Sequence, residues 1–255
     1  MIQRFAQASV GMVSAVALAA LAVPASGGAS TASTGPPASE LAPIHGPYSP
    51  SIDPANFVRA VDNRHMPLKP GTAFHFVGVR GRTKQTDDAV VLHKHKRILG
   101  VRSTVVRDTV SEHGHAVERT FDWYAQDRYG NVWYMGENSL ELQHGRLVRA
   151  SDSWKSGVHG AKPGIIMPGH PRPGDAYRQE YYPPGKALDL ARVVGRRGSV
   201  TVPYGSFKKP LVTLERSPLE PQTEKKYYVR GVGEVKEKVV KGHHEEFKLV
   251  SVTHR

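Results

Sequence analysis

Several carboxylates lie close to aromatic residues in the sequence, an arrangement that could support acid–base chemistry on a sugar. Hydrolysis of a glycosidic bond needs two carboxyl groups in one pocket. Asp127 falls in a predicted turn and Glu137 on the predicted exposed face of a short strand, so structural roles are favoured for both. One open function is therefore a secreted hydrolase of cell-wall or extracellular polysaccharide that uses two of Asp122, Asp152 and Glu180 as paired carboxylates.

Other catalytic motifs are missing from the sequence. The chain has no Cys, and Gly205-Ser206 lacks the flanking pattern of a strained nucleophile elbow. Gly231-Val232-Gly233 is too short for a dinucleotide loop, and no helix is predicted after it. The sequence therefore names no reaction, no catalytic residue and no cofactor, and it leaves open whether the protein is an enzyme.

Histidines at alternate positions could bind a metal ion. His93 and His95 lie two residues apart on a predicted strand, where both side chains would point to the same face. Lys94, Lys96 and Arg97 surround them with positive charge, which disfavours a cation. We therefore predict no metal site, with His93 and His95 as weak candidates only.

Aromatic residues cluster on the predicted strands and could line a ligand site. Ordinary core and cross-strand packing is the competing role, because alternation along a strand turns about half of the rings inward. The ligand-lining candidates are Trp123, Tyr124, Trp133, Tyr181, Tyr182 and Tyr228.

The elements that would position these residues are short strands separated by turns. Glu112-His113-Gly114-His115 and Gln143-His144-Gly145-Arg146 are typical of tight turns between antiparallel strands. We predict a mainly β fold, in which antiparallel meander sheets form a half-barrel or barrel from two related halves, with one or two short helices. The helices are expected to begin at Asp53-Pro54 and to occupy Lys186 to Val194.

A repeated pattern suggests the two halves. Lys69-Pro70-Gly71 before Phe74 matches Arg172-Pro173-Gly174 before Tyr177, and two further features recur in the same order at nearly the same spacing. Chance is the alternative, since Gly and Tyr are common near β turns. The predicted half-repeats cover residues 67–150 and 170–252.

The beginning of the chain predicts export. An apolar run from Val10 to Val23, followed by Pro24-Ala25, is typical of a signal peptide over residues 1–25. Residues 26–52 are rich in small residues and Pro and are expected to form a disordered leader before a β domain over residues 53–255. The mature chain is expected to have no transmembrane segment and to be secreted or extracellular, with possible cell-wall association.

The net charge of +12 favours anionic partners. Lys and Arg are scattered and mixed with Glu, so a nucleic-acid partner is not expected. The partners considered are a lipid-like ligand and an anionic cell-envelope polymer, and the oligomeric state stays open. The leading function is an exported non-enzymatic binding or envelope-associated protein that holds a hydrophobic or amphipathic ligand on a concave β surface.

Two groups of residues carry a family resemblance. The turn Val202-Pro203-Tyr204-Gly205-Ser206-Phe207 and the run Gly231 to Lys236 resemble the bacterial lipoprotein-carrier class, whose half-barrel holds acyl chains. Phe121 to Asp127 and Gly164 to Pro168 resemble uncharacterised secreted actinobacterial β proteins. The resemblance implies a half-barrel fold and a lipid-like ligand class, and no reaction.

Overall fold

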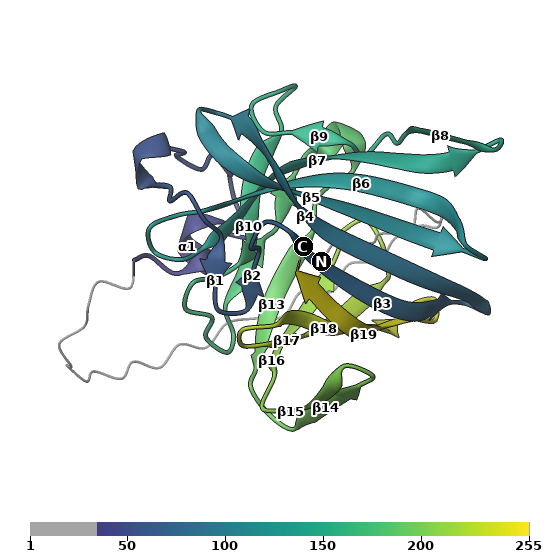
Figure 1. Ribbon diagram of the computed structural model, residues 1–255. Helices are drawn as coiled ribbons and strands as arrows, with labels where there is room; N and C mark the ends of the chain where they lie inside the picture. Colours follow the sequence, from purple (N-terminus) through teal and green to yellow (C-terminus); the bar gives the residue numbers. More distant parts are fainter. Residues whose placement is uncertain (1–34, 255) are drawn as a thin grey trace.

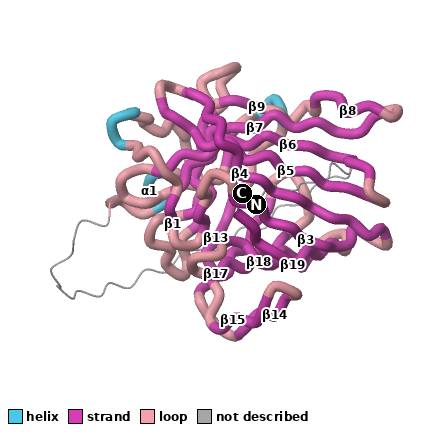
Figure 2. Tube along the Cα trace, viewed as in Figure 1, coloured by secondary structure: helices cyan, strands magenta, loops and turns pink. Residues whose placement is uncertain are grey.

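The computed structural model describes residues 35–254, which are mainly β (Figure 1, Figure 2). Besides the strands it contains one α-helix, α1 (Ala38–Leu41), and two short 3-10 helices, Pro54–Asn56 and Pro183–Gly185. The strands are β1 (Asp62–Asn63), β2 (Met66–Pro67), β3 (Thr72–Arg80), β4 (Thr83–Ile98), β5 (Val101–Glu112), β6 (His115–Gln126), β7 (Val132–Gln143), β8 (Arg146–Arg149), β9 (Trp154–Lys155), β10 (Lys162–Met167), β11 (Ala176–Arg178), β12 (Glu180–Tyr181), β13 (Leu190–Gly195), β14 (Ser199–Val202), β15 (Gly205–Lys208), β16 (Leu211–Arg216), β17 (Thr223–Val229), β18 (Gly233–Lys241) and β19 (Glu245–His254).

One 15-stranded antiparallel sheet nearly closes into a barrel, as predicted. Its order is β11-β13-β16-β17-β18-β19-β3-β4-β5-β6-β7-β10-β12, with β8 and β9 added to β7. The pairing of β19 with β3, in which Leu249 lies opposite Phe76, joins the end of the chain to the first long strand. The two edge strands, β11 and β12, are consecutive along the chain with only Gln179 between them, so one narrow seam is left unpaired.

Most of the sheet consists of two meanders, β3-β4-β5-β6-β7 and β11-β13-β16-β17-β18-β19. The same turn precedes each of them. The amide of Gly71 donates to Val91 O at 2.8 Å, and that of Gly174 donates to Val193 O at 2.9 Å. Both glycines have positive φ, 86° and 94° respectively, a conformation that glycine adopts without strain. This recurrence supports the predicted duplication, which stays a prediction.

The apolar core includes side chains inside the barrel. Phe74, Phe76, Phe247 and Leu249 are buried on neighbouring strands β3 and β19. The segment with α1, β1 and β2 lies at one end of the barrel (Figure 1) and contributes further buried apolar side chains. The hairpin turns β3–β4, β5–β6 and β7–β8 lie at the opposite end, on the right of Figure 1.

The predicted helices are partly wrong. Asp53 does cap a turn, since its Oδ1 accepts from Ala55 N at 3.0 Å, but the 3-10 helix ends after three residues. The predicted helix over Lys186 to Val194 is instead β13. Ala191, Val193 and Gly195 are buried while Arg192 and Val194 are exposed, which is the two-residue period of a strand rather than the helical period.

The segment before the barrel is more ordered than the sequence indicates. Part of the expected flexible leader is packed, with Ala38, Ala42 and Tyr48 buried in the core. The expected signal peptide, residues 1–25, and residues 26–34 lie outside the described part of the chain. Within residues 35–254, no helix is both long and apolar enough to cross a membrane.

Candidate ligand site in the barrel interior

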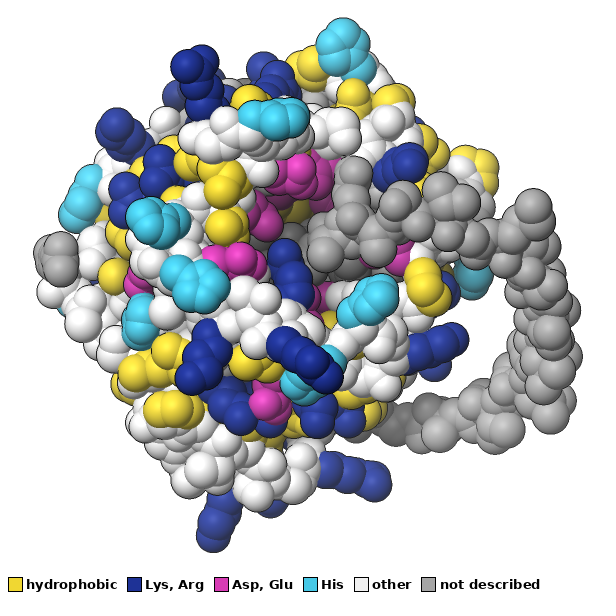
Figure 3. Space-filling view, turned by 90° about the vertical axis from the view of Figure 1, so that its right-hand side faces the viewer, with side chains coloured by type: hydrophobic (Ala, Val, Ile, Leu, Met, Phe, Trp, Pro, Cys, Tyr) yellow, Lys and Arg dark blue, Asp and Glu magenta, His cyan; other side chains and the backbone are white. Residues whose placement is uncertain are grey.

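The barrel interior contains many buried carboxyls. Side chains along strand β17 alternate between the interior and the outer face. Glu224, Lys226 and Tyr228 are buried, whereas Lys225 and Tyr227 between them are only half-buried. Figure 3 looks at the right-hand side of Figure 1, where acidic side chains lie in a hollow around basic ones. We call the buried carboxyls that interact there the acidic interior: Asp108, Asp122, Glu137, Glu180, Asp189, Glu215, Glu224, Glu234 and Glu237.

Lys226 is the only Lys or Arg that is buried within residues 35–254. Its Nζ lies 3.4 Å from Glu215 Oε2 and 3.4 Å from Glu237 Oε2, with Glu224 Oε2 at 4.0 Å. Burial by itself would lower the pKa of Lys226, but the Glu215 and Glu237 carboxylates outweigh it and hold this pKa well above its ordinary value. Lys226 is therefore a fixed positive charge in the middle of the carboxyls.

A second group of carboxyls surrounds the Tyr134 hydroxyl. Its oxygen lies 2.6 Å from Asp122 Oδ1 and 2.8 Å from Glu137 Oε2. A hydroxyl has one proton to donate, so only one of these contacts can use it, and the other carboxyl must carry a proton and donate to the Tyr134 oxygen. Burial raises the pKa of both Asp122 and Glu137 well above the usual range, in agreement with such a shared proton.

The pKa of the Glu180 carboxyl lies near neutral pH. Its Oε2 accepts from Trp154 Nε1 at 3.0 Å, and its carboxyl also hydrogen-bonds to that of Asp189. Burial raises the pKa of Glu180 to about 7 and that of Asp189 well above its usual range. A hydrogen bond between two carboxyls requires a proton on one of them, and the stronger shift assigns it to Asp189. The site therefore contains both hydrogen-bond donors and negative charge.

Glu137 is buried rather than exposed, so its predicted position on an outer face is wrong. Tyr134 and Glu137 are three residues apart and would face opposite sides of an unbroken strand. A register shift between β6 and β7 occurs at Trp123/Tyr124, opposite Gly136, whose φ is 129°. This irregularity turns both side chains toward the interior. By contrast, Asp127 is the predicted turn residue, since its Oδ1 accepts from Tyr129 N and Asn131 N.

The other predicted carboxylates are divided between two places. Asp122 and Glu180 belong to the acidic interior, and both influence Glu137 electrostatically. Asp152 is only half-buried, and its pKa is raised by burial and then by Glu141. Asp152 also affects the pKa of Glu137 and Glu180, so it lies at the margin of the same group.

Two of the six predicted ligand-lining aromatics face the acidic interior. Tyr124 stacks on Tyr134 with ring centroids 5.0 Å apart, and the Tyr228 hydroxyl donates to Glu215 Oε1 at 3.3 Å. Both rings are buried, and burial raises the pKa of both hydroxyls well above the usual range. These two rings are therefore packed inside the barrel, next to the buried carboxyls.

The remaining four aromatics lie elsewhere. Trp133 packs against Phe57, which belongs to the segment before the barrel. Tyr181 packs edge-on against Tyr48 of that segment. Trp123 and Tyr182 line a groove on the outer surface. The structure therefore does not bring the six candidates together on one surface.

Sequence reasoning missed Lys226 and its carboxyl partners. Thr223 to Val229 alternates between two polar faces, and nothing in the pattern marks one of them as internal. The weak metal candidates, His93 and His95, are both exposed, and no group of three potential ligands exists within residues 35–254.

No family model matches this sequence, and no curated protein matches it either. Among solved structures, a candidate exported protein with a YmcC-like fold from Bacteroides fragilis is similar over 75% of this chain and 99% of its own, with 12% identity and a TM-score of 0.42. A candidate lipoprotein from Parabacteroides distasonis covers the same shares with 12% identity and a TM-score of 0.40. MucB is similar over 76% of this chain and 55% of its own, at 10% identity and a TM-score of 0.27. At these values the similarities carry no function to this chain.

Proposed function

We propose that this chain is an exported, non-enzymatic binding protein that holds an amphipathic ligand with a cationic head group inside the barrel. The observation that carries the proposal is the presence of buried apolar side chains and buried carboxyls side by side in the interior: Phe76 lies opposite Asp87, and Phe247 opposite Glu237. An amphipathic molecule needs both environments.

The apolar side chains of the interior would hold the hydrocarbon part of the ligand. Phe74, Phe76, Phe247 and Leu249 offer aromatic and aliphatic surface on adjacent strands. Each buried methylene contributes about 0.8 kcal/mol, so a chain of moderate length would supply most of the affinity. Tyr124 and Tyr228 carry polar hydroxyls on apolar rings and suit the boundary between a hydrocarbon chain and its head group.

The acidic interior would select the head group. Carboxyls outnumber cations there, and Lys226 is already paired with Glu215 and Glu237. Burial raises the pKa values of Asp122, Glu137 and Glu180, and within residues 35–254 none of the three pairs with a Lys or Arg. An ammonium group placed beside them would stabilise their ionised forms, so its binding would release protons. An anionic head group would meet repulsion instead.

The basic exterior suits a protein that works close to an anionic cell envelope. The chain carries a net charge of +12 although its interior is acidic, so the positive charge is concentrated on the outer surface. Such a surface attracts anionic polymers and lipid head groups over about one Debye length, about 8 Å at physiological salt.

Two fluorescent probes with the same alkyl chain test the proposal, one ending in an amine and the other in a carboxylate. We expect the protein purified from a secreting host to bind the amine probe more tightly, with proton release detectable by calorimetry in buffers of different ionisation enthalpy. Mass spectrometry of the native protein would identify a co-purifying amphipath. Binding of neither probe, or equal binding of both, would reject the proposal.

A matched pair of variants assigns the head-group site. Glu137→Gln removes one carboxyl beside Tyr134, and we expect it to weaken binding of the amine probe about tenfold, as for loss of one charged hydrogen bond. Glu246→Gln removes a carboxyl that pairs with Lys236 and Lys248 on the outer surface, and it should leave binding unchanged. Equal effects of the two substitutions would place the ligand outside the acidic interior.

A second candidate function is the polysaccharide hydrolase. Asp122 and Glu137 share the Tyr134 hydroxyl and hold a proton between them, which suits a general acid beside a second carboxyl. Release of reducing sugar from wall polysaccharide, abolished by Asp122→Asn, would support this function. Absence of that activity together with tight binding of the amine probe would reject it.

A further inference from the structure

A groove on the outer surface of the barrel gathers positive charge without any acidic residue. The groove has a volume of about 490 Å³, and we call it the basic groove: its lining includes Lys96, Trp123, Arg149, Lys155, His159 and Tyr182. Its size falls in the range of small-molecule sites, about 300–1,000 Å³. No Asp or Glu contributes to the lining, although these residues are common elsewhere in the chain.

The three permanent cations of the basic groove are uncompensated. Within residues 35–254, Lys96, Arg149 and Lys155 form no ion pair with a carboxylate. Burial lowers the pKa of Lys96, and the nearby charges of Lys155 and Arg149 lower it further. The cations are therefore close enough to repel one another, and an anion placed between them would relieve that repulsion.

Lys96 is held in place by an aromatic ring. Its Nζ lies 3.9 Å from the centroid of the Trp123 ring, within the range of a cation–π contact. The Trp123 side chain is buried with Trp154 in the floor of the groove. Tyr182 is half-buried and adds a second aromatic ring. The groove thus combines an oriented cation with a flat apolar surface.

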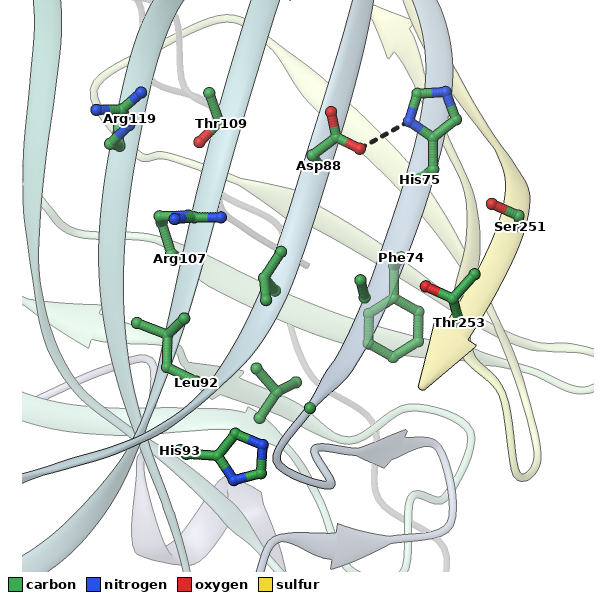
Figure 4. Close-up of a pocket in the computed structure, with 14 residues that line it drawn as sticks. Phe74, His75, Asp88, Leu92, His93, Arg107, Thr109, Arg119, Ser251 and Thr253 are labelled. Carbon is green, nitrogen blue, oxygen red and sulfur yellow. Dashed lines mark hydrogen bonds and ion pairs between the residues drawn. The ribbon is translucent and has the colours of Figure 1, made fainter. Parts of the chain in front are cut away.

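Other grooves on the outer surface differ in charge. In the groove of Figure 4, His75 of β3 points toward Asp88 of β4 and bonds to it at 2.8 Å, facing Arg107 and Arg119. In a third groove, Arg82 and Lys84 share the lining with Glu246, which is already paired with two lysines. Each of these two grooves has one carboxylate in its lining, whereas the basic groove has none.

We propose that the basic groove binds one segment of an acidic polysaccharide, with its carboxylate, phosphate or sulfate groups beside Lys96, Arg149 and Lys155 and a sugar ring against Tyr182. The recessed floor favours a single polymer chain over a bilayer, because a flat membrane surface cannot enter a groove of this size. This site opens on the outer surface, although Trp154 in its floor also donates to Glu180 of the acidic interior, and the two sites would take ligands of opposite charge.

Calorimetry with a short oligogalacturonate tests the site, and the methyl-esterified oligomer serves as the uncharged control with the same backbone. We expect binding of the acidic oligomer only, weakened by salt. The variant Lys96→Gln/Arg149→Gln should lose at least about tenfold in affinity. The control Arg82→Gln/Lys84→Gln removes the same charge from the groove that contains Glu246, and it should lose less than about twofold.

Three outcomes would overturn the proposal. Equal losses in both double variants would mean that net charge alone attracts the polymer. Binding to anionic vesicles with none to the oligomer would mean that the groove faces a membrane. Equal affinity for inorganic phosphate and for the oligomer would mean that no polymer is recognised. Binding of the amine probe is measured separately, so failure here leaves the proposal for the barrel interior intact.

Discussion

Replacement of Lys226 by Met is the most informative perturbation of the barrel interior. The substitution removes the positive charge and keeps a side chain of similar length. Glu215 and Glu237, each 3.4 Å from Nζ, would then be buried without a cation. Loss of one partner from a buried ion pair costs about 3–5 kcal/mol of unfolding free energy. We expect a loss of that size at pH 8.

The loss should shrink at acidic pH. Without Lys226, Glu224 loses a nearby positive charge that lowers its pKa, so its pKa in the folded state rises further above its value in the unfolded chain. Glu224 already shows this direction, since burial raises its pKa well above the usual range. A carboxyl whose pKa is higher in the folded state than in the unfolded chain stabilises the fold at a pH below its unfolded-state pKa. This stabilisation disappears as the pH rises through its folded-state pKa. The variant should therefore recover much of its stability at pH 5.

Urea denaturation at pH 5 and pH 8 measures both effects. Lys225→Met is the matched control, because Lys225 is the neighbouring residue on the same strand and points outward. We expect it to change the unfolding free energy by less than about 0.5 kcal/mol at either pH. The double variant Lys226→Met/Glu237→Gln should recover part of the loss at pH 8. Equal destabilisation at both pH values, or no difference between the two lysine variants, would refute the reasoning.

Three further predictions concern the carboxyls and the irregular strand. Burial raises the pKa of Glu180 and of Glu234 from 4.5 to about 7. Both groups should therefore contribute fully to the unfolding free energy of the wild type below pH 4.5, and this contribution should be lost as the pH rises to 7. Urea denaturation at a series of pH values measures this loss. Trp154→Phe removes the indole N–H that donates to Glu180 and that lowers the pKa of this carboxyl. The pKa of Glu180, followed by NMR, should therefore rise in this variant. Gly136→Ala would place a Cβ 2.5 Å from Trp154 O, at a φ of 129° that residues with a side chain rarely adopt. We expect the melting temperature to fall by several degrees. An unchanged melting temperature would contradict this prediction of backbone strain.

Much of the local structure could be predicted from the sequence. Gly114 and Gly145 mark hairpin turns that the structure contains, and Asp53 and Asp127 have the capping and turn roles that their positions indicate. These features depend on backbone conformation and on hydrogen bonds to near neighbours, which short stretches of sequence determine. The antiparallel meander follows from the same turns. The exception is β13, where short apolar runs suit either a helix or a strand.

The composition of the barrel interior was decided by tertiary structure. Strand β17 has charged or hydroxyl-bearing side chains on both faces, so only closure of the sheet shows that Glu224, Lys226 and Tyr228 point inward. The inward turn of Glu137 depends on a register shift against β6, which the sequence of β7 does not reveal by itself. The acidic group is assembled from strands far apart in the chain, and burial then changes the ionisation of its members. Sequence therefore determined where strands and turns lie, and long-range pairing determined which side chains share the low-dielectric interior.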